Sequence, residues 1–228
     1  MDNDKLARFI AGLGRFNNYG STVAQTKKAL ETGCTSHLRQ ENDDVVIFVD
    51  CLKAINEVVN QEFSVASIIA INAQFDGESK EQPQNPGYLR DGHEFPHCDI
   101  IMVPLWPGEE EMVVHRPPVK VEEQDLEKII NEWQDSRKDE HDSWQMFAKI
   151  ACLQPFQDGN KRTALIATNH ALGALKSQDY ILPPAGYHFN EFMNKLLQYY
   201  YHSKDDGHDE ALNRFANFAT IHGRIRQS

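Results

Sequence analysis

Residues 153–165 read LQPFQDGNKRTAL, and this stretch predicts the start of a helix directly after a polar turn. The turn, residues 158–160, is Asp-Gly-Asn, and Asp and Asn side chains accept hydrogen bonds from the unpaired N–H groups of a first helical turn. Lys161 and Arg162 follow, where the helix dipole already favours negative charge. The stretch is therefore either a helix cap with two incidental cations or a phosphate-binding site.

Several side chains of this stretch suit a metal-bound phosphate. The carboxylate of Asp158 is a hard oxygen ligand of the kind that Mg²⁺ prefers, and Mg²⁺ in turn bridges phosphates. Gly159 lets a ligand approach the backbone closely, and Asn160 can donate from its amide. Arg162 adds a planar charged fork, while Phe156 is expected to anchor the loop in the core. These features favour the phosphate site over a plain cap.

The composition of the whole chain is that of a globular protein. It has 228 residues, of which 40% are hydrophobic and 25% charged, with a formal net charge of −11. This length fits one large domain or a domain with an extension. The negative charge disfavours a nucleic-acid partner, and no apolar run approaches the roughly 20 residues that cross a bilayer. The N-terminus does not resemble a signal peptide, so we expect a cytoplasmic protein without a membrane partner.

The hydrophobic periodicity predicts a mainly α protein. Apolar stripes at helical spacing occur around 45–59, 64–75, 126–133, 144–151, 165–175, 189–201 and 212–219. The stretch 76–121 differs: it is rich in Pro and contains β-like pieces at 100–103 and 112–114, which predict an irregular, functional loop with a hairpin. We expect a helical N-terminal extension over 1–44 and one domain over 45–228, with its core at about 45–200 followed by C-terminal helices.

Two further patterns carry alternative hypotheses. His93-Glu94-Phe95-Pro96-His97 spells HExxH, a zinc-peptidase pattern that works when a helix places both His side chains on one face. Gly92 and Pro96 disfavour a helix there, so a polar turn is the preferred interpretation and a zinc peptidase the remote alternative. The four cysteines, Cys34, Cys51, Cys98 and Cys152, are scattered without a CxxC pair, which disfavours a disulfide or metal role.

Residues 154–163, QPFQDGNKRT, resemble the signature loop of the Fic/Doc (Fido) family, usually written HPFx(D/E)GN(G/K)R. The stretch Gly-Tyr-Leu-Arg at 87–90 lies upstream, where family members carry a flap. The resemblance covers about residues 45–200 and implies a Fic-type helical bundle with a small β-hairpin flap. Family members transfer AMP, or less often another phosphate-containing group, from a Mg-bound nucleotide to a protein hydroxyl.

The resemblance also implies roles for single residues. Asp158 would hold Mg²⁺, and Gly159, Asn160, Lys161 and Arg162 would bind the phosphates of ATP or another nucleoside triphosphate. The protein substrate, bearing a Ser, Thr or Tyr hydroxyl, would dock on the flap over 88–104. Homo-oligomerisation is left open.

This chain departs from the family pattern at the catalytic position. Family members have a His that takes the proton from the target hydroxyl, and here the residue is Gln154. A glutamine does not accept a proton near neutral pH, although its amide can bond a hydroxyl or phosphate. Lys161, and Leu165 where AMP-transferring members have a second Arg, resemble the Doc branch, whose members transfer the terminal phosphate.

Two functions from different classes follow from this comparison. The first is an enzyme, a protein adenylyltransferase or phosphotransferase in which Gln154 occupies the catalytic position with altered chemistry. The second is a catalytically weak Fic module that binds a nucleotide or phosphate. The intact Asp158, Gly159, Asn160 and Arg162 favour the enzyme, whereas Gln154 favours the binding module.

Overall fold

The computed structural model describes residues 2–41, 43–80, 82–94, 101–104, 112–203 and 205–223. Its elements are α1 (Asn3–Gly14), α2 (Val23–Thr32), α3 (Asp44–Val58), α4 (Val65–Ala73), β1 (Ile101–Pro104), β2 (Met112–His115), α5 (Glu123–Gln134), α6 (Glu140–Leu153), α7 (Asn160–Ala171), α8 (Ala174–Ser177), α9 (Tyr187–Tyr201) and α10 (His208–His222), with short 3₁₀ turns at Arg15–Asn17 and Thr35–His37. The predicted mainly α class with a small hairpin is confirmed.

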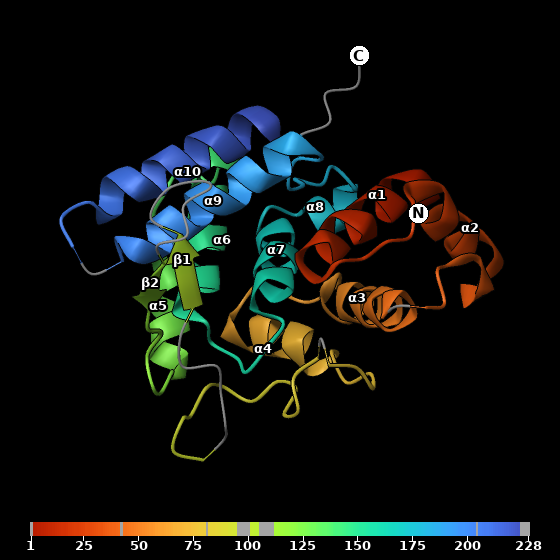
Figure 1. Cartoon of the computed structure of the whole chain (residues 1–228), viewed down its shortest axis with the longest axis horizontal. Helices are drawn as coiled ribbons and strands as arrows, with labels where there is room; N and C mark the ends of the chain where they lie inside the picture. Colours follow the sequence, from red (N-terminus) through yellow and green to blue (C-terminus); the bar gives the residue numbers. More distant parts are fainter. Residues whose placement is uncertain are drawn as a thin grey trace.

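Helix α7 lies at the centre of the fold, between α6 on one side and α1, α3 and α4 on the other (Figure 1). Every residue from Arg162 to His170 is buried, so this helix is enclosed on all sides. A helix in such a position needs apolar or small residues around its whole circumference. The sequence TALIATNHA supplies them, with Thr and Asn side chains bonded to nearby carbonyls.

Polar residues define where the surrounding helices begin. Ser64 and Ser67 form a reciprocal capping box at the start of α4, as Thr22 and Gln25 do at the start of α2. The side chain of Asp139 accepts a hydrogen bond from the backbone of Asp142 in α6. Such caps replace the missing partners of the first N–H groups and contribute about 1 kcal/mol each.

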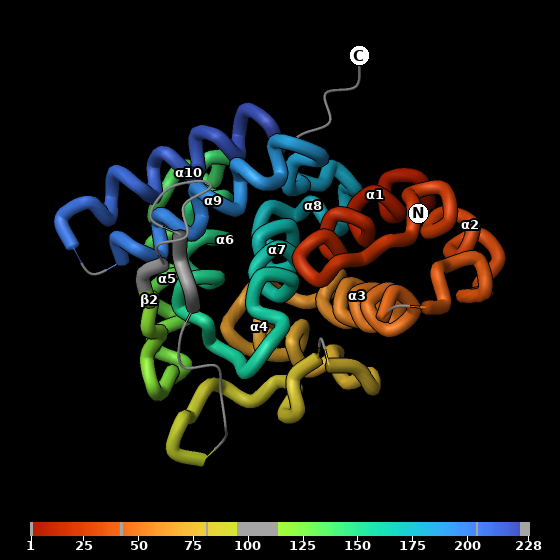
Figure 2. The backbone as a smooth tube through the Cα atoms, in the orientation of Figure 1, coloured from red at the N-terminus to blue at the C-terminus, as the bar shows by residue number. Residues whose placement is uncertain are grey.

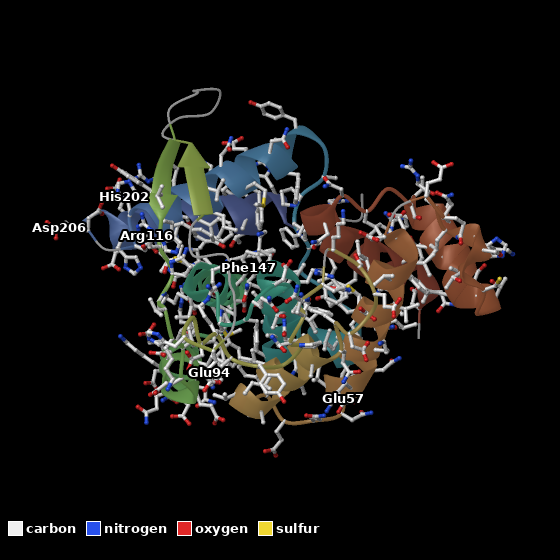
Figure 3. The ribbon with its side chains drawn as sticks, turned by 60° about the horizontal axis from the view of Figure 1, so that its bottom comes forward. Glu57, Glu94, Arg116, Phe147, His202 and Asp206 are labelled. Atoms are coloured by element: carbon white, nitrogen blue, oxygen red, sulfur yellow. The ribbon has the colours of Figure 1, made fainter. Side chains whose placement is uncertain are left out.

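An aromatic cluster packs α6 against the two C-terminal helices. Trp144 and Phe147 from α6 meet Phe192 of α9 and Phe215 of α10, with ring centroids 4.9 to 6.4 Å apart. Phe147 is completely buried and lies near the middle of the view in Figure 3, whereas Asp206 lies at the edge of that view. Rings in such edge-on and offset contacts stabilise a core beyond their buried area, which fixes the orientation of α6 and hence of its C-terminal end.

The N-terminal helices share the core with the rest of the chain. Phe9 and Ile10 of α1 are completely buried. The carboxylate of Asp44, at the start of α3, is also completely buried and accepts hydrogen bonds from the backbone N–H groups of Gly20 and Ser21. The division between 1–44 and 45–228 remains a prediction, but α1 and α3 are in direct contact.

The expected continuation of the helix after the motif as far as Leu175 is wrong. α7 ends at Ala171, and Gly173 then takes the left-handed conformation, with φ of 71°. Glycine is the usual residue at such a helix end because it has no Cβ to clash there. Leu175 still reaches the core, but from the separate short helix α8.

The hairpin pairs β1 with β2 in antiparallel register, with Met102 opposite Val114, close to the predicted strands. Residues 82–94, which precede it in the chain, run as a loop below α4 (Figure 2). Within the described residues, no helix is both long and apolar enough to cross a membrane.

Candidate functional site

The signature stretch forms a tight loop between α6 and α7. Gln154 ends α6 in the left-handed conformation, with φ of 54° and ψ of 55°, and Gly159 precedes α7 with φ of 77°. A non-glycine residue in this region costs about 1 kcal/mol or more. The loop must therefore be held by its surroundings. Phe156 provides one such contact, because its side chain is completely buried, as expected for the anchor.

The side chain of Asn160 holds the loop from within. Its Oδ1 accepts a hydrogen bond from the backbone N–H of Phe156 at 2.9 Å, and its Nδ2 donates to the Phe156 carbonyl at 3.0 Å. The same Nδ2 donates to Oε1 of Gln154, also at 3.0 Å. Asn160 is 5% exposed. The amide that the sequence assigned to a phosphate is thus bonded inside the loop, and any part it has in binding is through the shape of the loop.

The amide of Gln154 is likewise engaged on both sides. Its Nε2 donates to the carbonyl of Ala151 at 2.5 Å, and its Oε1 accepts from Asn160. The hydroxyl of Tyr200 donates to the same Ala151 carbonyl at 2.8 Å. Burial raises the pKa of Tyr200 well above its ordinary value, so this hydroxyl stays protonated. Neither Gln154 nor Tyr200 therefore serves as a proton acceptor near neutral pH.

Asp158 lies half-buried at the entrance of α7. One carboxylate oxygen, Oδ1, accepts a hydrogen bond from the N–H of Gly159 at 2.5 Å, and the main-chain carbonyl accepts one from Nδ2 of Asn72 at 3.0 Å. Mg²⁺ is commonly held by one or two carboxylates together with water and substrate phosphates. A single fixed carboxylate beside a helix N-terminus fits that donor set.

The two cations of the motif occupy different environments. Arg162 is completely buried, and its guanidinium lies over the ring of Phe75, with Cζ 4.7 Å from the centroid. Lys161 is half-buried and makes no hydrogen bond or ion pair with the described residues. Burial lowers the pKa of Lys161, the charge of Arg162 lowers it further, and the carboxylate of Asp158 opposes both. Lys161 is therefore the cation better placed to reach a ligand from solvent.

Gly159 is required by its neighbours in the protein. A Cβ at this position would lie 2.6 Å from Cδ2 of Phe75, well inside van der Waals contact. With φ of 77°, the backbone also has a conformation that other residues rarely adopt. On this side of the loop, the group that approaches the Gly159 backbone closely is the ring of Phe75.

Three residues that received no role from the sequence complete the site, two of them outside the motif and one within it. We call residues 84–91 the strap, because they run across the outside of the loop. Arg90, which is 2% exposed, donates from Nε to the carbonyl of Gln154 at 2.8 Å, and its backbone N–H donates to that of Pro155 at 2.8 Å. Leu89 forms an isolated bridge with Phe156. The sequence pointed to the strap through the family pattern at 87–90, but gave Arg90 no role.

The second and third residues are Asn72 and Gln157. Asn72, in α4, is completely buried and bonds both the loop and the strap. Oε1 of Gln157 accepts hydrogen bonds from the backbone N–H groups of Gln84 and Asn85, at 2.8 and 3.2 Å. A signal for Asn72 existed in the sequence: it is the only Asn in the apolar run VASIIAINA of α4.

The HExxH stretch is described only in part. His93 and Glu94 are exposed and lie in a turn, where the N–H of Glu94 donates to the carbonyl of Asp91 at 3.1 Å. Phe95, Pro96 and His97 lie outside the described residues. A turn at the first two positions does not provide the helical spacing on which the zinc-peptidase hypothesis depends.

Comparisons with known proteins agree with this geometry. Residues 62–172 match the sequence profile of the Fic/DOC family. A Fic domain containing signaling protein from Bacteroides thetaiotaomicron has a similar structure, with a TM-score of 0.62 and 16% identity over 96% of this chain and 82% of that chain. Fic-1 from C. elegans has a TM-score of 0.59 and 16% identity over 98% of this chain and 61% of that chain.

No curated protein sequence matches the chain. At 16% identity, the two structures establish the shared fold, while the profile match covers the loop itself and both helices that flank it. Residues 62–172 therefore match the Fic/DOC family, and the chain shares its fold with two Fic domain proteins.

Proposed function

We propose that this protein binds a Mg-bound nucleoside triphosphate at the N-terminus of α7 and transfers AMP or a phosphate from it to a protein hydroxyl. The observation that carries the proposal is that Asp158 and Lys161 flank the start of α7, with the Asp158 carboxylate close enough to Lys161 to raise its pKa. N–H groups at a helix N-terminus and the helix dipole both attract phosphate.

The residues of the chain would share the work as follows. Asp158 would hold Mg²⁺, which when bound neutralises charge on the phosphates and positions them for displacement. Lys161 would bind a phosphate oxygen, and the charge of buried Arg162 would add to the positive potential of the site. Asn160 and Arg90 would keep the loop in its binding shape through their bonds to its backbone. Such preorganisation is a main source of catalysis in phosphoryl transfer.

The transfer step itself would proceed without a protein base at position 154. The hydroxyl oxygen of the acceptor attacks the phosphorus, the bond from that phosphorus to its bridging oxygen breaks, and pyrophosphate or a nucleoside diphosphate leaves. The hydroxyl proton would pass to solvent or to a phosphate oxygen, because the Gln154 amide does not accept it. A missing general base typically costs ~10²–10⁴ in rate, so we expect slow transfer.

The acceptor protein would dock on the flap over 88–104. The described part of this region includes the C-terminal half of the strap, which contacts the loop directly, and β1 of the hairpin. An extended piece of a target can add to an exposed strand by main-chain hydrogen bonds. This docking would bring a target hydroxyl to the loop from the side of the strap.

A second candidate is a nucleotide-binding module without transfer. The bonding of Gln154 favours it, because both ends of the amide are already bonded within the protein and hold it in the framework of the loop. In that case the protein would bind the same nucleotide and present it, or the conformation it induces, to a partner.

Incubation with ATP labelled in the α- or the γ-phosphate, Mg²⁺ and a cell lysate from which nucleotides have been removed tests both candidates. Transfer of α-label indicates adenylylation and transfer of γ-label indicates phosphorylation. Calorimetry with ATP and Mg²⁺ measures binding separately. Binding without transfer of either label favours the module, and absence of both binding and transfer contradicts the proposed function.

A further inference from the structure

Asn72 joins three parts of the site through one side chain. Its Nδ2 donates to the carbonyl of Asp158 at 3.0 Å and to Oγ1 of Thr163 at 3.2 Å, while its Oδ1 accepts from the N–H of Gly87 at 2.9 Å. Asn72 is completely buried. The predicted metal ligand, the first turns of α7 and the strap therefore share one buried amide.

The strap is pressed closely onto α4 where Asn72 bonds it. A Cβ on Gly87 would lie 2.8 Å from the Cβ of Ala73, the residue next to Asn72, and φ of Gly87 is 78°. Only glycine allows the backbone N–H to reach the Asn72 side chain at this distance. On the far side, Gln157 bonds the strap at residues 84 and 85. The strap is thus attached both to α4 and to the loop.

The hydrogen bonds of Asn72 restrict the backbone of Asp158. The Nδ2 donor fixes the carbonyl of Asp158, and Thr163 fixes the distance from that carbonyl to the body of α7. With its carbonyl held, Asp158 has little backbone freedom to turn its carboxylate away from the entrance of α7. Removing a group that orients a metal ligand in this way typically lowers metal affinity or activity by roughly 10–100-fold.

From these contacts we infer that Asn72 is a positioning residue that sets the Mg²⁺-dependent affinity of the site by fastening the strap to the backbone of Asp158. This inference rests on the proposed function, since it concerns the same nucleotide site. It also links the strap to the metal ligand: a movement of the strap at Gly87 and a movement of Asp158 disturb the same side chain. Binding events at the two places are then coupled reciprocally.

Asn169 provides a matched control. It is also completely buried, and it also bonds three groups, donating to the carbonyls of Leu165 and Ile181 and accepting from the N–H of Ile181. It lies in the C-terminal half of α7, away from the loop. Asn72→Ala and Asn169→Ala therefore remove the same chemistry from the same kind of environment, and both should lower the melting temperature.

The experiment measures the dissociation constant of ATP by calorimetry, in Mg²⁺ and in EDTA, for the wild type and both variants. The dissociation constant in EDTA divided by that in Mg²⁺ measures how much the metal strengthens binding. We expect Asn72→Ala to reduce this ratio roughly tenfold or more, and Asn169→Ala to leave it unchanged. An unchanged ratio in Asn72→Ala, or an equal loss in Asn169→Ala, overturns the inference. Should Asn72→Ala not fold, Asn72→Ser, whose shorter side chain cannot reach Gly87 and Asp158 together, replaces it.

Hydrogen exchange separates this inference from the proposed function. Asn72→Ala should raise the exchange of the strap and of residues 154–159 together, and Asn169→Ala should raise neither. If the wild type does not bind ATP, the proposed function fails. The exchange result then tests only whether Asn72 holds the strap and the loop together. Exchange that rises in only one of the two segments, or in neither, overturns it.

Discussion

Asn160 donates from Nδ2 to Oε1 of Gln154 over 3.0 Å, and Gln154 donates onward from Nε2 to the carbonyl of Ala151. The residue at the catalytic position of the family is thus part of the framework of the loop. Its left-handed backbone, with φ of 54°, is supported by these bonds and by Arg90 on its carbonyl. Any substitution at this position therefore changes both chemistry and loop geometry.

Gln154→His should raise transfer of AMP or phosphate, because the remaining specified positions of the loop already carry the residues of the family pattern. An imidazole can accept the hydroxyl proton near neutral pH, and a positioned base contributes ~10²–10⁴ in rate. Transfer from α- and γ-labelled ATP measures the gain and shows which phosphate moves.

Gln154→Ala is the control for that substitution. If Gln154 only replaces a lost base, alanine should leave transfer per bound nucleotide unchanged, with some loss of stability because Asn160 and the Ala151 carbonyl each lose one hydrogen bond. If the amide itself orients a hydroxyl or phosphate, both His and Ala should lower activity. Nucleotide binding without transfer by the wild type and by Gln154→His would support the binding module instead.

Asp158→Ala should abolish the Mg²⁺ dependence of nucleotide binding, because it removes the only carboxylate that the motif provides. Asp139→Ala is a matched control, since Asp139 also precedes a helix and caps it by accepting from the N–H of Asp142 at 3.0 Å. The control should lose about 1 kcal/mol of stability without affecting the nucleotide. Calorimetry that shows equal Mg-ATP affinity in wild type and Asp158→Ala would contradict the metal assignment.

Much of the fold follows from local pattern. The stripe Trp144, Phe147, Ala148 and Ala151 predicts α6, and Phe192, Leu196 and Tyr200 predict α9, because burial on one face imposes helical spacing on apolar residues. The end of α7 was missed for a local reason as well: Leu175 continues the apolar period although Gly173 stops the helix. Periodicity alone does not register a glycine stop.

The support of the site was not predictable in the same way. Asn72 lies 86 residues before the Asp158 carbonyl that it bonds, and Arg90 lies 64 residues before Gln154. Hydrogen bonds between such distant positions leave no periodic trace in a single sequence. Residue type predicted Asn160 and Gly159 as ligand contacts, which stays a prediction, and it gave no sign of the bonds and packing that both residues make within the protein.

Gly159→Ala should destabilise the protein more than Gly173→Ala does. Both glycines have φ above 70°, so alanine costs about 1–2 kcal/mol at either position. At Gly159 the new Cβ also meets Phe75 at 2.6 Å, whereas at Gly173 nothing lies within 4 Å. Overpacking adds about 1–3 kcal/mol, which urea unfolding of both variants would resolve. Equal losses would show that Phe75 moves aside at no cost.

The last prediction concerns His170, which is buried at the far end of α7. Its Nε2 lies 3.1 Å from the carbonyl of Gln61, and its Nδ1 is buried without a hydrogen-bond partner among the described residues. Burial lowers the pKa of His170 below 6.5, with a small further decrease from the charge of Lys176, while the bond to Gln61 opposes the shift. The unfolded chain therefore binds this proton at a higher pH than the folded protein does.

Because the unfolded state then holds more protons, the contribution of His170 to the free energy of unfolding is fully present above pH 6.5. It is lost as the pH falls below 6.5, by at most about 1.4 kcal/mol per pH unit. His170→Gln removes this titration, so its free energy of unfolding should fall less steeply between pH 6.5 and pH 5 than that of the wild type. His93→Gln, in an exposed turn, is the control and should keep the wild-type slope. Urea unfolding at several pH values measures all three proteins. An unchanged slope in His170→Gln would mean that the folded protein protonates His170 as readily as the unfolded chain does.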